Sequence, residues 1–106
     1  MSRLPRTWIV TRHKGAAEFI NSLGYEGISA QHLDLGEVGV GDTVVGVIPM
    51  GMAEKLVNLR VNVIHLYVEL TFKDRGKDLS AARLAELNAE LRHVNVSSSR
   101  AKKRAF

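Results

Sequence analysis

Four consecutive residues between Thr11 and Lys14 carry side chains that bind anions or move protons. Arg12 offers a planar fork of N–H donors for phosphate oxygens, Lys14 offers a point charge, and Thr11 adds a hydroxyl. A histidine such as His13 can take up or release a proton near neutral pH. Together with the following Gly15, these residue types predict a small site for an anion, and a phosphate in particular. A solvated basic loop is the alternative interpretation.

The flanking residues predict the elements that would hold this site. Residues 7–11 read as a buried strand, because Trp8, Ile9 and Val10 are aromatic or branched and apolar. A helix is predicted from Lys14 or Gly15 to Leu23, with apolar residues at helical spacing and Gly24 after its end: Ala16, Phe19, Ile20 and Leu23. The basic turn would therefore lie where a strand ends and a helix begins, which is where open α/β sheets bind ligands and where helix N–H groups favour anions.

Two other turns are predicted to reach the same edge of the sheet. His32 and Asp34 follow a weak strand over residues 28–33, and Pro49, Met50 and Gly51 follow a strongly apolar strand over residues 43–48. A histidine with a nearby carboxylate can act as an oriented acid or base, or it can be an ordinary surface pair. Met50 and Met52 would form apolar walls or part of the core. Gly51 would let a ligand approach the start of the next helix.

The rest of the chain continues the alternation of strands and helices. We expect a helix over residues 52–59, a strand over residues 62–68, and a last helix from the cap Ser80 to about Val94, whose apolar residues follow a 3, 4, 3 spacing: Leu84, Leu87, Leu91 and Val94. This order predicts one α/β domain over residues 1–96, with a mainly parallel sheet between layers of helices. Residues 97–106 are predicted to be a basic, disordered tail.

Three further polar features lie outside these turns. Arg75, Gly76 and Lys77 could grip an anion as a mobile loop, but Asp74 and Asp78 flank them, so a solvated loop with internally compensated charge is the alternative. His65, among apolar residues, is interpreted as a hydrogen-bonded core residue. His93 would lie near the C-terminus of the last helix, where the helix dipole favours a cation.

Composition narrows the classes of function. The chain of 106 residues has no cysteine, and we see no signal peptide and no apolar run near the roughly 20 residues that a membrane span needs. We expect a cytoplasmic protein without a membrane partner. No residues have the spacing of a metal site, and no P-loop or dinucleotide fingerprint is present, so we expect neither a metal nor a cofactor.

The net charge of +4 does not indicate a nucleic-acid-binding surface. Four of the fifteen Lys and Arg residues lie in the last seven positions, and the remaining eleven equal the eleven Asp and Glu residues. The body of the domain is therefore formally neutral, unlike a protein that binds duplex DNA, and we expect no DNA partner. The tail could be a non-specific tether or a solubilising end.

Several blocks of the sequence resemble one known family. The blocks are Val10-Thr11-Arg12-His13-Lys14-Gly15-Ala16, His32-Leu33-Asp34, residues 41–46 and residues 75–80. Their order and spacing are similar to those of small CRISPR-associated proteins of the Csx group, found beside type III systems and marked by a V-T-R-H-x-G-A turn. The resemblance implies a Rossmann-like homodimer related to CARF sensor domains. It also implies ring nuclease activity on cyclic tetra-adenylate, the second messenger of antiviral defence by type III systems.

The same resemblance assigns roles to individual residues. It places Thr11, Arg12, His13 and Gly15 at the ligand, His32 and Asp34 beside it, and Arg75 on a covering loop. Lys14 occupies the variable position of the V-T-R-H-x-G-A turn.

A metal-independent mechanism fits these residue types. A ribose 2′-hydroxyl would attack the adjacent phosphorus, giving linear products with a 2′,3′-cyclic phosphate, while Arg12 and Lys14 stabilise the developing charge and His13 assists proton transfer.

Two other functions remain open from the sequence. A non-enzymatic sensor or sponge would bind the cyclic nucleotide without cutting it. A small RNA-binding module would use the basic tail, although an aromatic content of 6% offers few stacking platforms.

Overall fold

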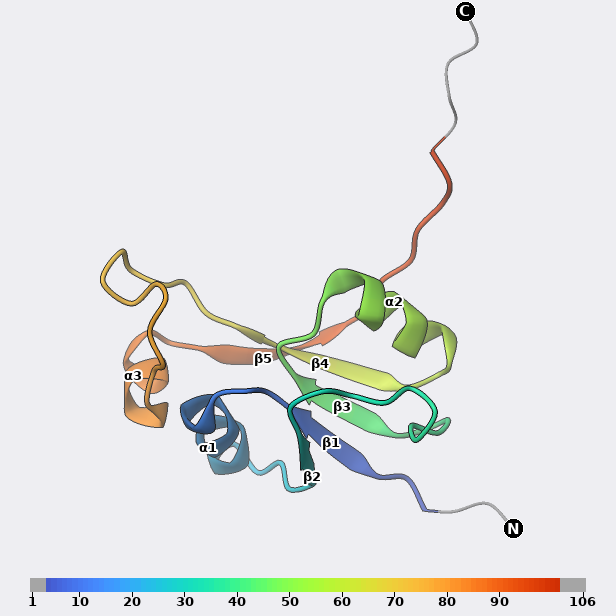
Figure 1. Ribbon diagram of the computed structural model, residues 1–106, viewed down its shortest axis with the longest axis horizontal. Helices are drawn as coiled ribbons and strands as arrows, with labels where there is room; N and C mark the ends of the chain where they lie inside the picture. The colour runs from blue at the N-terminus through green and yellow to red at the C-terminus, as the bar shows by residue number, and fades with distance from the viewer. Residues whose placement is uncertain (1–3, 102–106) are drawn as a thin grey trace, which may run out of the picture.

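The computed structural model describes residues 4–101, which form five strands and three helices (Figure 1). In chain order these are β1 (Thr7–Val10), α1 (Lys14–Ser22), β2 (Ile28–Ala30), β3 (Thr43–Gly46), α2 (Met50–Asn58), β4 (Asn62–Tyr67), α3 (Ala81–Glu86) and β5 (Glu90–Val94).

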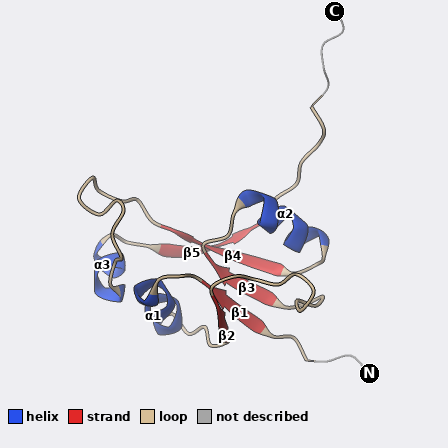
Figure 2. Ribbon diagram, in the orientation of Figure 1, coloured by secondary structure: helices blue, strands red, loops and turns tan. Residues whose placement is uncertain are grey.

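The strands form one sheet in the order β2-β1-β3-β4-β5 (Figure 2). The first four strands are parallel, and β5 pairs antiparallel with β4 at the edge. Strand β1 has β2 on one side and β3 on the other, so the chain changes direction across the sheet between β2 and β3. In open α/β sheets a crevice forms at such a reversal, beyond the carboxyl ends of the strands.

Apolar side chains alternate between the two faces of the sheet, because successive residues of a strand point to opposite sides. On one face Trp8, Val44 and Val63 form a buried cluster with Ala53 and Leu56 of α2. The opposite face is covered by the other two helices, and its buried residues are Ile9, Ile20, Val45 and Ile64 in one cluster and Ala16, Phe19, Leu66 and Leu84 in another. Figure 1 shows α1 and α3 on one side of the sheet and α2 on the other. The sheet therefore lies between two helical layers.

A buried carboxylate fixes the start of β1 against β3. The side chain of Asp42 is fully buried and accepts hydrogen bonds from the Trp8 indole at 3.0 Å, the Arg6 backbone N–H at 2.9 Å and the Gly39 N–H at 2.9 Å. A carboxylate can be buried only when its oxygens are satisfied in this way. Asp42 therefore holds the end of the sheet that lies opposite the carboxyl ends of β1 and β3.

Most predicted elements are confirmed, with bounds that differ by one to three residues. β2 ends at Ala30 and β3 at Gly46, each earlier than the sequence pattern indicates, and α2 begins at Met50 rather than Met52. Gly24 follows α1 with a φ of +99°, and its N–H donates to Asn21, as expected of a residue that closes a helix. The mixed α/β class and the mainly parallel sheet are therefore correct.

The predicted helix over residues 80–94 begins where expected, after the cap Ser80, but its predicted end is wrong. It ends at Glu86, because Asn88 adopts a left-handed φ of +57° and Ala89 donates its N–H to Leu84. The chain then reverses and pairs with β4, where Leu91 contacts the α1 and α3 side of the core and Val94 the α2 side. Their spacing of three residues fits a helix locally, but the pairing with β4 is a long-range interaction.

His93 needs the same correction, because it lies within β5 and not near a helix terminus. Its sheet partner is Ile64 of β4, and its side chain is exposed.

The predicted tail is described only in part. Residues 97–101 contain no helix or strand, and Ser98 donates a hydrogen bond to Glu54 at 2.6 Å. Three of the four basic residues of the tail, Lys102, Lys103 and Arg104, lie outside the described residues. No helix within residues 4–101 is long and apolar enough to cross a membrane.

Candidate functional site

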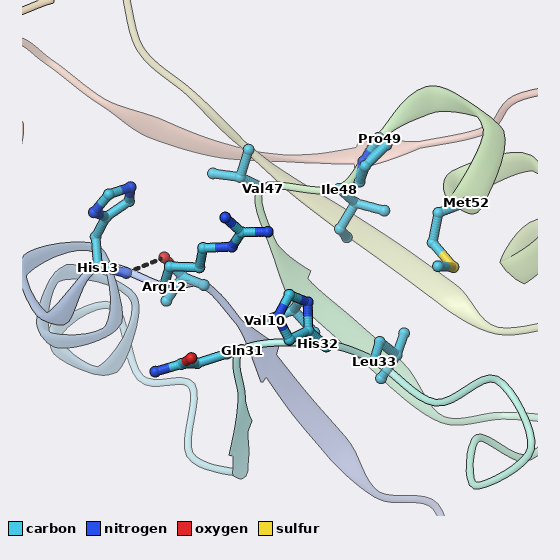
Figure 3. Close-up of a pocket in the computed structure, with 11 residues that line it drawn as sticks. Val10, Arg12, His13, Gln31, His32, Leu33, Val47, Ile48, Pro49 and Met52 are labelled. Carbon is cyan, nitrogen blue, oxygen red and sulfur yellow. Dashed lines mark hydrogen bonds between the residues drawn. The ribbon is translucent and has the colours of Figure 1, made fainter. Parts of the chain in front are cut away.

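A pocket of about 440 Å³ lies beyond the carboxyl ends of β1, β2 and β3 (Figure 3). Its lining comes from the three segments that follow these strands and from the start of α2: Val10, Thr11, Arg12, His13, Gln31, His32, Leu33, Val47, Ile48, Pro49 and Met52. The pocket therefore occupies the crevice between the two crossovers of the sheet, and its volume is in the usual range for small-molecule sites.

The side chain of Arg12 points into this pocket. Figure 3 shows it extending from the end of β1 toward the middle of the lining residues, in the direction of Val47. Within residues 4–101, no carboxylate forms an ion pair with Arg12 and no carbonyl accepts from its guanidinium. An exposed guanidinium without an acidic partner is suited to bind an anion that enters from solvent.

Two helices begin at the pocket, and neither start is capped by a side chain. His13 is the residue before α1 and Pro49 the residue before α2, and both line the cavity. The first turn of each helix also lacks an acidic residue. Because unpaired N–H groups and the helix dipole make a helix start partly positive, the two starts add to the charge of Arg12.

His13 is held from two sides. Its backbone N–H donates to the hydroxyl oxygen of Thr11 at 3.1 Å, drawn as the dashed line in Figure 3. Its imidazole Nδ1 lies 2.5 Å from a carboxylate oxygen of Asp78, a residue of the segment before α3. Thr11, Arg12 and His13 line both the main pocket and a shallower one next to it. The sequence predicted these three residues for the site, and the structure brings them together. The contact of His13 with Asp78 was not predicted.

Two glycines allow backbone segments to approach closely around the site. A β-carbon on Gly15 would lie 1.8 Å from the carbonyl oxygen of Leu79, and one on Gly46 would lie 1.9 Å from the carbonyl oxygen of Val10. Gly46 also has a φ of +150°. Both glycines are thus required by packing. The predicted contact of Gly15 with the ligand stays a prediction.

Around Arg12 the pocket has a wall that the sequence predicted only partly. His32 lines it, as expected. Met52 lines it as an apolar wall, which is one of the two roles expected for it. Gln31 and Leu33 line it as well and were missed, although each lies next to His32. Gln31 adds an amide that can both donate and accept hydrogen bonds.

Lys14 and Asp34 are predicted site residues that do not line this pocket. Lys14 belongs to the neighbouring shallow pocket and lies 3.9 Å from Glu18, one turn along α1. Asp34 accepts the N–H of Gly36 at 2.8 Å and thereby stabilises its own turn. Their predicted roles at the ligand stay predictions.

Met50, Gly51 and Arg75 do not line the main pocket either, and their predicted roles at the ligand stay predictions. Met50 lines a second cavity beside His65, and Arg75 lines a cavity on the segment after β4. Gly51 lies in the first turn of α2, where an added β-carbon would contact nothing within 4 Å. The protein itself therefore places no steric demand for glycine at position 51.

The interpretation of residues 74–78 as an internally compensated loop needs correction. Asp74 is buried and binds Arg83 at 2.9 and 3.0 Å and the Thr71 hydroxyl at 2.5 Å. The hydrogen bonds from Arg83, and then that from Thr71, hold the pKa of Asp74 well below its usual range. Asp74 thus anchors the segment to α3 and does not neutralise Arg75.

His65 is a hydrogen-bonded residue of the sheet, as predicted. Its Nδ1 accepts the N–H of Ile48 at 3.2 Å, and its ring contacts that of Tyr67 edge to face. Partial burial lowers the pKa of His65, which favours the neutral ring that this acceptor role requires.

No group of three or more potential metal-ligating side chains occurs among the residues that the structure describes. Arg12, the histidines and the two helix starts are instead groups that attract anions. The arrangement can hold a phosphate beside an imidazole that is able to move a proton.

Comparison with known proteins gives one match. A family model described as "Putative CRISPR-associated protein (Cas_VVA1548)" matches residues 8–97, which include every strand, every helix and the pocket except the start of β1. No curated protein and no solved structure matches the chain significantly. Because the match covers most of its length, this chain belongs to the CRISPR-associated family Cas_VVA1548.

Proposed function

We propose that this protein is a ring nuclease that binds cyclic tetra-adenylate and opens it without a metal, thereby switching off type III CRISPR signalling. The observation that carries the proposal is the position of Arg12, which has no ion-pair partner among residues 4–101, in a pocket between two uncapped helix starts. The CRISPR-associated family and the resemblance of the Val10–Ala16 turn to ring nucleases support the choice of ligand.

The pocket offers the groups that such a reaction needs. Arg12 and the N–H groups at the start of α1 would bind the non-bridging oxygens of one phosphate, whose charge grows as the 2′-oxygen attacks. His13, beside Arg12 in the lining, would take the 2′ proton. Most of the acceleration would come from holding the 2′-oxygen in line with the bond that breaks.

A homodimer is part of the proposal. A cavity of about 440 Å³ is suited to part of a ring of four nucleotides, and a two-fold dimer would present the same site twice to a ligand with matching symmetry. Val47 at the pocket and Met50 at the start of α2 are exposed apolar residues, 54% and 76% accessible, that a second copy would cover.

Incubation of the purified protein with cyclic tetra-adenylate in EDTA tests the proposal. We expect linear products that end in a 2′,3′-cyclic phosphate, resolved by chromatography and mass spectrometry. Intact ligand that nevertheless raises the melting temperature would instead show a sensor or sponge. If the ligand is neither cleaved nor bound, both functions are refuted. Binding of linear RNA that is lost when residues 97–106 are deleted would establish the RNA-binding module.

A further inference from the structure

We propose that Asp78 is a positioning residue for His13, which holds the imidazole through Nδ1 and leaves Nε2 as the nitrogen that accepts a proton. The inference rests on the proposed function for its catalytic consequence. The contact itself is independent of that function, because Nδ1 and a carboxylate oxygen of Asp78 lie 2.5 Å apart.

The chemistry of the two groups fixes the tautomer of His13. An ionised carboxylate can only accept hydrogen bonds, so Nδ1 must carry the proton that is shared with Asp78. The neutral ring then has its lone pair on Nε2. A histidine held in this way can accept a proton from a substrate hydroxyl without first rotating or changing its tautomer.

The contact between His13 and Asp78 is not an incidental contact between two mobile surface side chains. The side chains are 55% and 84% exposed, and an exposed pair between mobile side chains contributes little. Here, however, the backbone on both sides is fixed. Leu79, the residue after Asp78, packs its carbonyl against Gly15 in the first turn of α1, two residues after His13. The backbone therefore keeps Asp78 beside His13.

The segment that carries Asp78 is also anchored at both ends. Ser80 accepts the N–H of Arg83 at 3.0 Å and thereby caps α3. Asp74 binds both Thr71 and the Arg83 side chain. Hydrogen bonds therefore hold residues 71–80, which connect β4 to α3, against the start of α3, and Asp78 is the acidic side chain of this connection that contacts His13.

The other charged groups near His13 have different partners or orientations. Lys14 lies within reach of Glu18, and Arg12 extends toward the middle of the pocket. Of the acidic side chains that the structure describes, Asp78 is the one in contact with His13.

The reaction balances with water as the only other participant. The 2′-oxygen forms a bond to phosphorus and its proton passes to Nε2 of His13, while the bond from phosphorus to the 5′-oxygen breaks. The leaving 5′-oxygen takes a proton from water, and the imidazolium returns its proton to solvent. Asp78 stays ionised and stabilises the imidazolium while it exists.

A positioning role predicts opposite effects on binding and on cleavage. The negative charge of Asp78 lies close to a site for phosphates, so removing it should make binding of the ligand equal or tighter. In Asp78→Asn the same change removes the charge that stabilises the imidazolium, and the tautomer of His13 is no longer fixed, because an amide can either accept from Nδ1 or donate to it. The chemical step should therefore slow. A residue with a purely structural role would weaken both.

The decisive variants are Asp78→Asn and Asp78→Glu, with Glu26→Gln as a control that removes an exposed charge elsewhere. We expect Asp78→Asn to lower the single-turnover rate about tenfold or more while its dissociation constant for cyclic tetra-adenylate stays equal or falls. Asp78→Glu should recover part of the rate. An unchanged rate in Asp78→Asn, or losses in binding and rate of equal size, would overturn the inference.

A measurement without ligand separates this inference from the proposed function. Long-range ¹H–¹⁵N spectra of the neutral imidazole should show His13 with its proton on Nδ1 in the wild type and mainly on Nε2 in Asp78→Ala. Identical tautomers in the two proteins would refute the pair. Wild-type protein that shows the expected tautomer but does not cleave the ring would instead refute the proposed function and, with it, the catalytic role of Asp78.

Discussion

The carbonyl oxygen of Leu79 occupies the space that a side chain at Gly15 would need, 1.8 Å from the ideal β-carbon position. This contact joins the first turn of α1 to the segment before α3. It brings together two regions that are far apart in the sequence, the turn that carries Arg12 and His13 and the connection that carries Asp78.

Gly15→Ala should destabilise the protein by about 1 to 3 kcal/mol, because the added methyl group meets backbone that cannot rotate away. Urea unfolding checks the value. Gly51→Ala is the matched control, since its β-carbon meets open space in a helix and should leave stability equal or raise it by up to about 1 kcal/mol. Equal effects of the two substitutions would contradict the packing that we describe.

Arg12→Ala should weaken binding of cyclic tetra-adenylate at least about tenfold, because a charge-assisted contact to phosphate contributes roughly 1.5 to 3 kcal/mol. Isothermal titration calorimetry measures the loss. Arg100→Ala removes the same charge from an exposed position after β5 and should bind like the wild type. Equal weakening by both variants would indicate a general effect of net charge and not a site at Arg12.

Asp42→Asn should lower the free energy of unfolding by about 1 to 3 kcal/mol. The amide keeps the shape of the side chain but directs an NH₂ group at one of the N–H donors that the carboxylate satisfies. Chemical denaturation followed by Trp8 fluorescence measures the change. Asp34→Asn is the control and should be nearly neutral, because an asparagine can also accept the N–H of Gly36.

The lowered pKa of Asp74 predicts how stability depends on pH. A carboxyl group whose pKa is lower in the folded state stabilises the protein above its unfolded pKa, about 3.9, and loses that contribution as pH falls through the folded value. The difference in unfolding free energy between wild type and Asp74→Asn should therefore be constant near neutral pH and shrink below about pH 4. A difference that does not change between pH 7 and pH 2 would contradict the pairing with Arg83.

Asn88 ends α3 in a left-handed conformation, which predicts how substitutions there act. Asn88→Gly should be neutral or stabilising, whereas Asn88→Val should cost about 1 to 2 kcal/mol, because a β-branched side chain resists a positive φ. Thermal unfolding by circular dichroism distinguishes them. Similar melting temperatures for both variants would mean that the chain does not turn at Asn88.

Local patterns predicted the part of the fold that depends on neighbours in sequence. The apolar run at Trp8–Val10 and the stripe from Ala16 to Ile20 gave β1 and α1 their correct places. The pattern failed between Leu87 and Val94, because the three-residue spacing of Leu91 and Val94 fits a helix as well as an edge strand that contributes to both faces of the core. Pairing with β4 decided the outcome, and no local signal reports it.

The candidate site likewise contains residues that the sequence could predict and contacts that it could not. Residues next to the ends of parallel strands, such as Arg12 and His32, could be placed because the topology brings those ends together. The direction of a side chain on a helix could not be predicted as reliably. Lys14 lies near Glu18 and does not line the main pocket. The contact of Asp78 with His13 could not be predicted, because it spans 65 positions of the chain and depends on the tertiary packing of Leu79.

The two uncapped helix starts have a consequence for any binding measurement. A cavity that gathers positive potential without a carboxylate of its own discriminates poorly between anions, so inorganic phosphate or sulfate in a buffer would compete for the same N–H groups. The apparent affinity for the cyclic nucleotide should then fall as the phosphate concentration rises at constant ionic strength. Free phosphate would also raise the melting temperature, because an anion that binds only the folded state stabilises it by mass action. In the cell, the pool of small phosphates would set the threshold at which the ring is captured.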